Sequence, residues 1–253
     1  MGKAILRLAL ERPHMTRIVA ALVKHGSPLI GKPLRDDFGD VAGTLVHAAS
    51  FETVAQADVI VDFSTPQAFD EALAAAVSQR IAFVSGTTGL AAEQHAAMKR
   101  AADTIPVLWS ANFSIGVAVL TQLVQDAARA LSEWDCEIVE AHHRDKKDAP
   151  SGTALALGRA IADARGAELD KVATFDRAAR NAPRDPAALG FASVRAGDIV
   201  GEHTVLFAGD GERIEFVHRA TDRDIFARGA LQAAVWIAAR PTGIYSLSDT
   251  LER

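Results

Sequence analysis

The chain has 253 residues, of which 49% are hydrophobic and 23% charged, and its net charge at pH 7 is −5. This composition is typical of a globular protein with one large or two ordinary domains, and the acidic balance argues against a general nucleic-acid or membrane surface. Cys136 has no second cysteine to pair with, so no disulfide can form within the chain. No apolar run reaches the roughly 18 residues of a membrane span, and no signal peptide is recognisable. We therefore expect a cytoplasmic protein.

The first half of the chain alternates helix-like and strand-like patterns. Apolar residues at helical spacing predict a helix over residues 2–12, which Pro13 ends. Continuous apolar runs predict strands buried on both faces at residues 17–23, 58–63, 81–85 and 105–110. Helical patterns follow two of these runs, at residues 66–78 and 91–102. This alternation is typical of a Rossmann-like, doubly wound parallel sheet.

The pattern changes after Asn112. Helices are expected over residues 116–131 and 151–165, with a strand between them at residues 136–143. Three strand candidates separated by glycine-containing turns follow at residues 190–197, 203–209 and 212–220, which indicates antiparallel pairing. A last helix over residues 224–239 has an apolar face that could pack on the first domain. We therefore expect an α/β Rossmann-like nucleotide-binding domain (1–112 with 224–253) and an α+β domain (113–223).

Two loops are expected to meet at one edge of the first sheet. SGTTG (85–89) follows a strand and opens a helix whose first N–H groups are free to bind a ligand, and WSANFS (109–114) ends the next strand. Ligands bind outside the carboxyl ends of such strands. For the first loop a plain strand-to-helix turn capped by threonine is the alternative.

The segment GSPLIGKP (26–33) has the glycine and lysine spacing of a phosphate-binding loop. However, Pro33 stands where such a loop has the hydroxyl residue that binds magnesium, so we expect no ATP site there.

Cationic side chains gather in HHRDKK (142–147), directly before a helix start at residues 150–153. The strand places His142 and His143 on opposite faces, and no ligand spacing supports zinc, so we expect no metal. Cations beside a helix N-terminus suit a carboxylate, and histidine and lysine can donate protons. The substrate predicted from these residues is a small dicarboxylate with a protonatable carbon or nitrogen. A solvated charged loop is the alternative.

The stretch EAHHRDKKDAPSGTAL (140–155) resembles the signature of the dihydrodipicolinate reductase family. VSGTTG, SANFSIGV, GFASVRAGDIVGEHTVLFAGDGERIEFVHRA and FARGA resemble further blocks of that family in the same order, over nearly the whole chain. The resemblance implies reduction of the cyclic unsaturated dicarboxylate 4-hydroxy-tetrahydrodipicolinate to tetrahydrodipicolinate by NADPH or NADH, in diaminopimelate and lysine biosynthesis. It also implies a dinucleotide-binding first domain and a homotetramer built through the second, substrate-binding domain.

The resemblance also implies roles for single residues. His142 and Lys146 would be the catalytic proton donors. The residues implied in binding the substrate are His143, Ser151, Gly152 and Thr153. The residues implied in lining the cofactor are Gly86, Thr87, Thr88, Ser110, Ala111, Asn112 and Phe113.

The sequence departs from the family pattern in two places. The family begins with a strand and a glycine loop, of which only Met1 and Gly2 match here, so either the start is misassigned or truncated, or the protein is naturally shortened and impaired in cofactor binding. Because a sheet without this strand would expose strand edges, we expect the chain as given to fold poorly or to bind cofactor weakly. Where the family often has an acidic residue for the cofactor ribose, Val23 precedes Lys24 and His25. Because a cation accommodates the phosphate of NADPH, we expect Lys24 to bind cofactor and NADPH to be preferred over NADH, unless Lys24 and His25 are merely exposed loop residues.

Two rival functions remain open at this stage. A non-catalytic or impaired anion-binding relative would use the cationic pocket without hydride transfer. A semialdehyde dehydrogenase would need a nucleophilic thiol, for which Cys136 is the single candidate.

Overall fold

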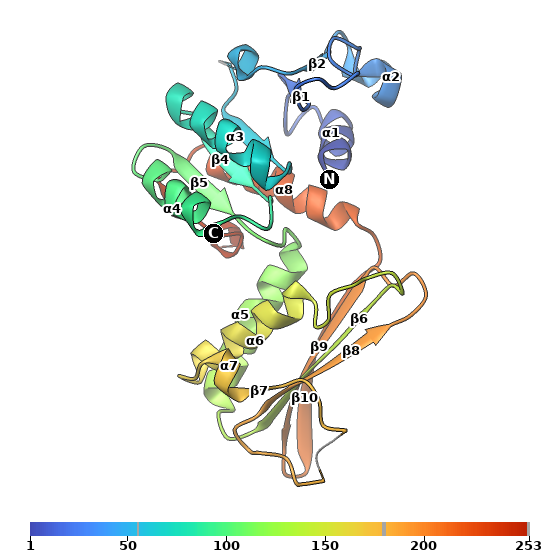
Figure 1. The fold of residues 1–253 in the computed structure, drawn as a ribbon, viewed down its shortest axis with the longest axis vertical. Coiled ribbons are helices and arrows are strands. Elements are labelled where there is room, and N and C mark those ends of the chain that lie inside the picture. Colours follow the sequence, from blue (N-terminus) through green and yellow to red (C-terminus); the bar gives the residue numbers. More distant parts are fainter. Residues whose placement is uncertain (55, 179–180, 252–253) are drawn as a thin grey trace. The chain divides into compact units, whose positions relative to one another are not determined.

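Figure 1 shows the computed structural model, which describes residues 1–54, 56–178 and 181–251. The chain forms two compact units, one of Met1–Ser114 with Asp224–Arg253 and one of Ile115–Arg223. Within the described ranges, no helix is both long enough and apolar enough to cross a lipid bilayer.

A parallel sheet with strand order β11-β5-β4-β3 forms the centre of the first unit. Its strands are β3 (Val59–Asp62), β4 (Ala82–Ser85), β5 (Pro106–Trp109) and β11 (Gly243–Tyr245). All residues of β4 are buried, as its continuous apolar run predicts. The helices of this unit are α1 (Gly2–Leu10), α2 (Arg35–Phe38), α3 (Pro66–Gln79), α4 (Ala92–Ala101), α8 (Asp224–Ile237) and the 3-10 turns η1 (Asp40–Ala42), η2 (Phe51–Val54) and η3 (Ser248–Leu251).

The last helix, α8, packs against β3, β4, β5 and α1, although it comes more than a hundred residues after the strands that it covers. Its buried residues are Ala227, Gly229, Ala230, Leu231, Ala233, Ala234 and Ile237. The small side chains in this set allow the helix to lie close to the sheet. Of the apolar face predicted for this helix, Ala227, Ala230, Leu231 and Ala234 are buried as expected, whereas Val235 and Ala238 are exposed.

The prediction of a strand at residues 17–23 is wrong for most of this segment. Only Ala21–Leu22 form a strand, β1, which pairs in parallel with β2 (His47–Ala48) in a separate two-stranded sheet. Ile18, Val19 and Ala20 are only partly buried, and this segment and β3 both line a cavity of about 440 Å³. An apolar run predicts burial, but a strand also needs a neighbour for its ladder of hydrogen bonds, and here β2 supplies that ladder for two residues.

The second unit contains a mixed sheet with strand order β10-β9-β6-β8-β7. Its strands are β6 (Asp135–His142), β7 (Ala173–Thr174), β8 (Leu189–Arg195), β9 (Gly201–Gly209) and β10 (Glu212–Ala220). Its helices are α5 (Ile115–Ala130), α6 (Gly152–Ala164) and α7 (Leu169–Val172). The apolar core of this unit includes buried residues of α5, α6, β6, β8 and β9, among them Val124, Leu157, Ile138, Phe191 and Phe207.

The antiparallel prediction for the last three strands is right for one pair only. The strands β9 and β10 form a hairpin through Asp210 and Gly211, and Gly211 takes the positive φ of 85° that such a two-residue turn requires. The strand β8 pairs instead in parallel with β6, which lies between β8 and β9. Turn residues predict where a strand ends, but not which strand becomes its neighbour.

Candidate active site

The centre of the candidate site is the carboxyl end of β6. Side chains alternate between the two faces of a strand, so Cys136, Ile138, Glu140 and His142 share one face, and the first three of these are completely or almost completely buried. The same strand therefore carries part of the apolar core and then, at its end, two polar side chains. Glu140 Oε2 lies 2.6 Å from His142 Nδ1.

Glu140 accepts hydrogen bonds from several other members of this polar cluster. Arg195 on the neighbouring strand β8 donates from Nη1 to Oε2 and from Nη2 to Oε1, each at 2.8 Å. The backbone N–H of Ser151 donates to Oε1 at 3.1 Å. The carboxylate is only 1% exposed. It therefore joins β6, β8 and the start of α6 within the second unit.

The charge of Glu140 is retained despite its burial. Burial by itself would raise the pKa of Glu140, but hydrogen bonds from Arg195, His142 and Ser193 outweigh this effect and lower the pKa to about 2. A buried carboxylate keeps its charge only when such partners replace the lost water. Glu140 is consequently an anion at every pH at which an enzyme of this kind would work.

Two further groups complete the cluster. The ring of His203 on β9 packs edge-on against that of His142, with a centroid distance of 5.3 Å, and His203 Nε2 lies 3.0 Å from Ser151 Oγ. Ser151 is the N-cap of α6, and its hydroxyl accepts a hydrogen bond from the backbone N–H of Ala154. Burial, followed by repulsion from His142, lowers the pKa of His203 to about 4, so this histidine is neutral near pH 7.

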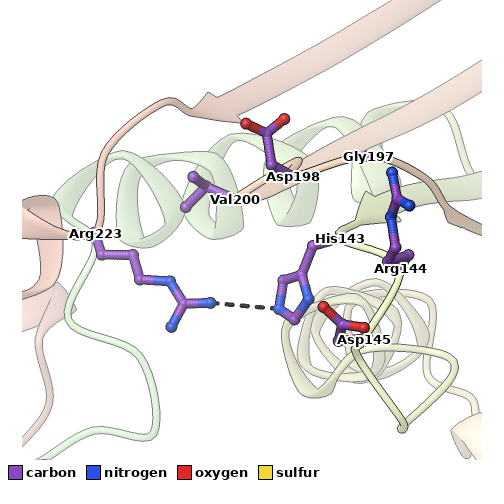
Figure 2. A pocket seen from close by; sticks show the side chains of 7 residues that line it. All are labelled: His143, Arg144, Asp145, Gly197, Asp198, Val200 and Arg223. Atoms are coloured by element: carbon purple, nitrogen blue, oxygen red, sulfur yellow. Dashed lines mark hydrogen bonds between the residues drawn. The ribbon is translucent and has the colours of Figure 1, made fainter.

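The loop after β6 carries the remaining predicted residues of this region. Lys146 Nζ lies 2.8 Å from both carboxylate oxygens of Asp148, and this pairing lowers the pKa of Asp148. His143 Nε2 lies 3.3 Å from Arg223 Nη2 (Figure 2). Gly152 is exposed at the first turn of α6, and Thr153 beside it is partly buried.

His143 and Arg223 line an open cavity of about 630 Å³. Figure 2 shows its lining residues, which are His143, Arg144, Asp145, Gly197, Asp198, Val200 and Arg223. The two arginines and the histidine offer several N–H donors to an anionic ligand. The cavity is thus large and polar enough for a small charged molecule.

At the carboxyl edge of the other sheet, Asp62 organises the first predicted cofactor loop. The hydroxyls of Ser85 and Thr87 donate to Asp62 Oδ2 at 2.8 Å, and the backbone N–H of Ser64 donates to Oδ1 at 3.1 Å. The hydroxyl of Thr87 is therefore occupied in bracing the loop. A Cβ on Gly86 would lie 2.2 Å from the ring of Phe63, so any larger residue there would force this ring to move. Thr88 next to it is exposed.

The second predicted cofactor loop is held by its own polar atoms. Ser110 Oγ donates to the carbonyl oxygen of Asn112 at 2.7 Å, and Asn112 Oδ1 accepts from the backbone N–H of Ser114 at 2.8 Å. Phe113 is buried against Phe63 with a ring centroid distance of 5.0 Å. Ala111 is exposed. Because β4 and β5 are hydrogen-bonded neighbours, the two loops begin side by side.

Two predicted features stand apart from these clusters. Lys24 is exposed just beyond β1. Cys136 is fully buried, and burial raises the pKa of its thiol to about 12, which does not suit the reactive thiolate of a semialdehyde dehydrogenase. Across residues 1–54, 56–178 and 181–251 there is no group of three or more histidine, cysteine or acidic side chains placed to hold a metal ion.

The structure adds polar residues that the sequence reasoning did not single out, namely Asp62, Glu140, Arg195, His203 and Arg223. A local signal existed for Glu140, because it lies two residues before His142 on a strand and must share its face. No local signal exists for Arg195 or His203, which come from other strands.

Two family profiles together cover nearly the whole chain. The profile described as "Dihydrodipicolinate reductase, N-terminus" matches residues 1–113, and that described as "Dihydrodipicolinate reductase, C-terminus" matches residues 116–251. The 4-hydroxy-tetrahydrodipicolinate reductase of Stenotrophomonas maltophilia (strain R551-3) is 49% identical over 260 residues, which span 100% of this chain and 93% of that protein. The reductase of the same name from Halorhodospira halophila is 42% identical over 257 residues, with 99% and 94% covered.

A solved structure supports the fold class. The dipicolinate-bound dihydrodipicolinate reductase from Paenisporosarcina sp. TG-14 superimposes with a TM-score of 0.70 at 20% sequence identity, covering 95% of this chain and 93% of that one. The expected combination of a Rossmann-like α/β domain and an α+β domain is thereby confirmed.

Proposed function

The chain belongs to the dihydrodipicolinate reductase family, and from this we propose that it reduces 4-hydroxy-tetrahydrodipicolinate to tetrahydrodipicolinate in diaminopimelate and lysine biosynthesis. It is an NAD(P)H-dependent oxidoreductase. The observation that carries the proposal is the cluster at the end of β6, where a buried carboxylate, an imidazole and a helix N-terminus are joined by hydrogen bonds. The alternative of a non-catalytic relative is not favoured, because the similar proteins over nearly the full length are named as reductases.

The proposed substrate is a small dicarboxylate, and the second unit offers the groups that would hold it. The N-terminus of α6 presents the backbone of Gly152 and Thr153 after the Ser151 cap, and helix N-termini favour anions. His143 lines the neighbouring cavity with Arg144 and Arg223. These residues would bind the carboxylates, and we assign residues 113–223 to substrate binding.

We assign cofactor binding to residues 1–112 with 224–253, which lie within the first unit. The loops at the ends of β4 and β5 fit a dinucleotide, because small residues leave their backbone accessible at Thr88 and Ala111, and Asp62 holds the first loop rigid. The residues proposed to line the cofactor are Gly86, Thr87, Thr88, Ser110, Ala111, Asn112 and Phe113. When bound, NAD(P)H supplies the hydride.

The overall conversion consumes one hydride and one proton and releases the 4-hydroxyl group of the substrate as water, so the site must also supply a proton. His142 and Lys146 are the proposed donors, and both lie in the segment that begins at the end of β6. The surrounding cationic side chains would stabilise the electron-rich ring while the proton is transferred. The role of this unit is thus to bind the dicarboxylate and to supply the proton.

A turnover assay tests this function. The purified chain is supplied with NADPH and with substrate formed in place from pyruvate and aspartate semialdehyde, and NADPH oxidation is followed. Lys146→Ala is expected to lower kcat by roughly 100- to 10,000-fold, because it removes a proton donor. Lys147→Ala, at the exposed neighbouring lysine, is the matched control and should keep the wild-type rate. Absence of turnover in the wild-type protein would contradict the proposed function.

We further propose that the protein is a homotetramer assembled through the second unit. The sheet face opposite the helices carries a cross-strand row in which Ala192, Val139 and Val217 are apolar and Thr204 is the one polar member, and these residues pair in register across β8, β6, β9 and β10. Val139 is 40% and Val217 42% exposed. Exposed apolar patches of this kind commonly mark protein interfaces.

A further inference from the structure

We propose that Glu140 is a positioning residue that fixes the tautomer and orientation of the His142 imidazole, with Arg195 as the clamp that holds Glu140 in place. The inference rests on the proposed function, because Glu140 would act on the reaction through His142. Glu140 itself would contact neither substrate nor cofactor.

The contact with Glu140 sets the tautomer of His142. An ionised carboxylate has only acceptor atoms, so the 2.6 Å contact between Glu140 Oε2 and His142 Nδ1 requires the proton to be on Nδ1. In the neutral imidazole the lone pair is then on Nε2, and in the charged form Nε2 carries the proton that can be given to substrate. Glu140 thereby assigns the reactive role to one nitrogen of the ring.

A glycine, Gly201, lies near His142 Nε2. A Cβ built on Gly201 would lie 3.1 Å from His142 Nε2, so any larger residue at the start of β9 would press on this side of the ring. The ring is held by hydrogen bonding at Nδ1, and the residue of β9 that lies near Nε2 is a glycine without a side chain. Such an arrangement suits a group that must exchange a proton rather than one that only fills space.

Arg195 also connects Glu140 to the loop that follows β6. Besides its two bonds to Glu140, Arg195 Nη2 donates to the carbonyl oxygen of Asp148 at 2.6 Å, and the carboxylate of Asp148 pairs with Lys146. Arg195 therefore ties the strand that bears His142 to the loop that bears the second proposed donor. One guanidinium fork orients the groups on both sides of the site.

The charged and titratable groups around His142 are few. Glu140 contacts it from β6, Arg195 lies beside Glu140 on β8, and His203 packs against the ring from β9. His218 follows on β10 opposite His203, and the loop contributes the Lys146–Asp148 pair. Glu140 contacts the imidazole directly, at 2.6 Å, so its removal takes away the charged partner of Nδ1.

The kinetic test uses Glu140→Gln, which keeps the size of the side chain and removes its charge. We expect kcat to fall roughly 10- to 100-fold, with the KM for NADPH unchanged, since partners that orient a histidine typically contribute this much. The alkaline limb of the pH profile should move to lower pH, because an anion no longer favours the protonated imidazole.

Glu137→Gln is the matched control. Glu137 is also a carboxylate of β6 that pairs with an arginine, at 3.0 Å from Arg184 Nε, but it lies on the opposite face of the strand. This variant should keep the wild-type kcat and pH profile. An equal loss in both variants would show a general effect on the sheet and overturn the proposal.

A double-variant cycle separates positioning from a merely structural role. If Glu140 acts through His142, then adding Glu140→Gln to His142→Ala should change kcat by less than twofold. If the substitution lowers kcat by the same factor with and without the imidazole, the proposal is wrong.

Nitrogen-15 NMR of the wild-type protein gives a test that needs no variant of Glu140. The signals of His142 are identified by their loss in His142→Gln. A neutral ring protonated on Nδ1 is the expected result, and a neutral ring protonated on Nε2 would overturn the inference. Because this result does not depend on turnover, it separates failure of this inference from failure of the proposed function.

Discussion

Two residues of the second unit relate its stability to pH. The buried His203 is neutral because its pKa is about 4 in the folded state against an ordinary value of 6.5, and Glu140 is charged because its pKa is about 2 against 4.5. In both cases the folded state binds protons less readily than the unfolded state. The stabilisation is therefore present at neutral pH and is lost on acidification, first from His203 and then from Glu140.

For His203 the expected loss falls between pH 6.5 and pH 4, and it amounts to roughly 3 kcal/mol of unfolding free energy. Denaturant unfolding at a series of pH values measures this slope. His203→Gln, which cannot be protonated, should flatten the curve in that interval. A His203→Gln curve with the wild-type slope would contradict the assignment.

The preference for NADPH is a prediction about Lys24. A cation beyond the second strand of such a domain can pair with the extra phosphate of NADPH, and Lys24 is exposed at this position. Lys24→Glu should lower kcat/KM for NADPH relative to NADH by roughly 10-fold, as attraction becomes repulsion. Steady-state kinetics with both cofactors measure the ratio, and Lys32→Glu, at another exposed lysine, is the control. Equal effects of the two substitutions would refute a specific role.

At the scale of elements, α8 lies close to the loop after β5. A Cβ on Gly229 would lie 1.8 Å from the carbonyl oxygen of Phe113, so the helix can take its place only if this residue is glycine. This contact gives a physical reason for the glycine of FARGA, which sequence reasoning identified only by resemblance. The helix thereby buttresses the loop proposed to line the cofactor.

Gly229→Ala is expected to destabilise the protein by about 1–3 kcal/mol and to raise the KM for NADPH, because either the helix or the Phe113 loop must move. Thermal unfolding and cofactor titration measure the two effects. Gly2→Ala is the control, since a Cβ at Gly2 meets nothing within 4 Å, and it should be neutral or slightly stabilising. Wild-type stability in Gly229→Ala would show that the contact is not as tight as described.

At the scale of the whole molecule, the exposed apolar row on the sheet of the second unit predicts assembly. Val139→Lys combined with Val217→Lys should shift a tetramer towards smaller species, because charges would have to be buried in the interface. Sedimentation or light scattering measures the mass. Val119→Lys, at an equally exposed valine on α5, is the matched control and should leave the mass unchanged. An unchanged mass in the double variant would place the interface elsewhere.

Local sequence patterns were enough to predict many of the helices and strands. The apolar runs of β3, β4 and β5, the alternation along β6, the Ser151 cap of α6 and the apolar face of α8 all follow from spacing that a single segment carries. The motif from Glu140 to Leu155 also sufficed to recognise the family. Such features are predictable because helical and strand periods relate neighbours in the chain.

The tertiary structure alone decided which segments meet. Residues 17–23 have the composition of a central strand but lie outside the main sheet, and β6 lies between β8 and β9 although turn signals predicted neighbours in chain order. The contacts that complete the candidate site join Glu140 to Arg195 across 55 residues and Ser151 to His203 across 52. No local period relates residues so far apart, because their proximity depends on strand pairing, and pairing is set by the packing of the whole unit.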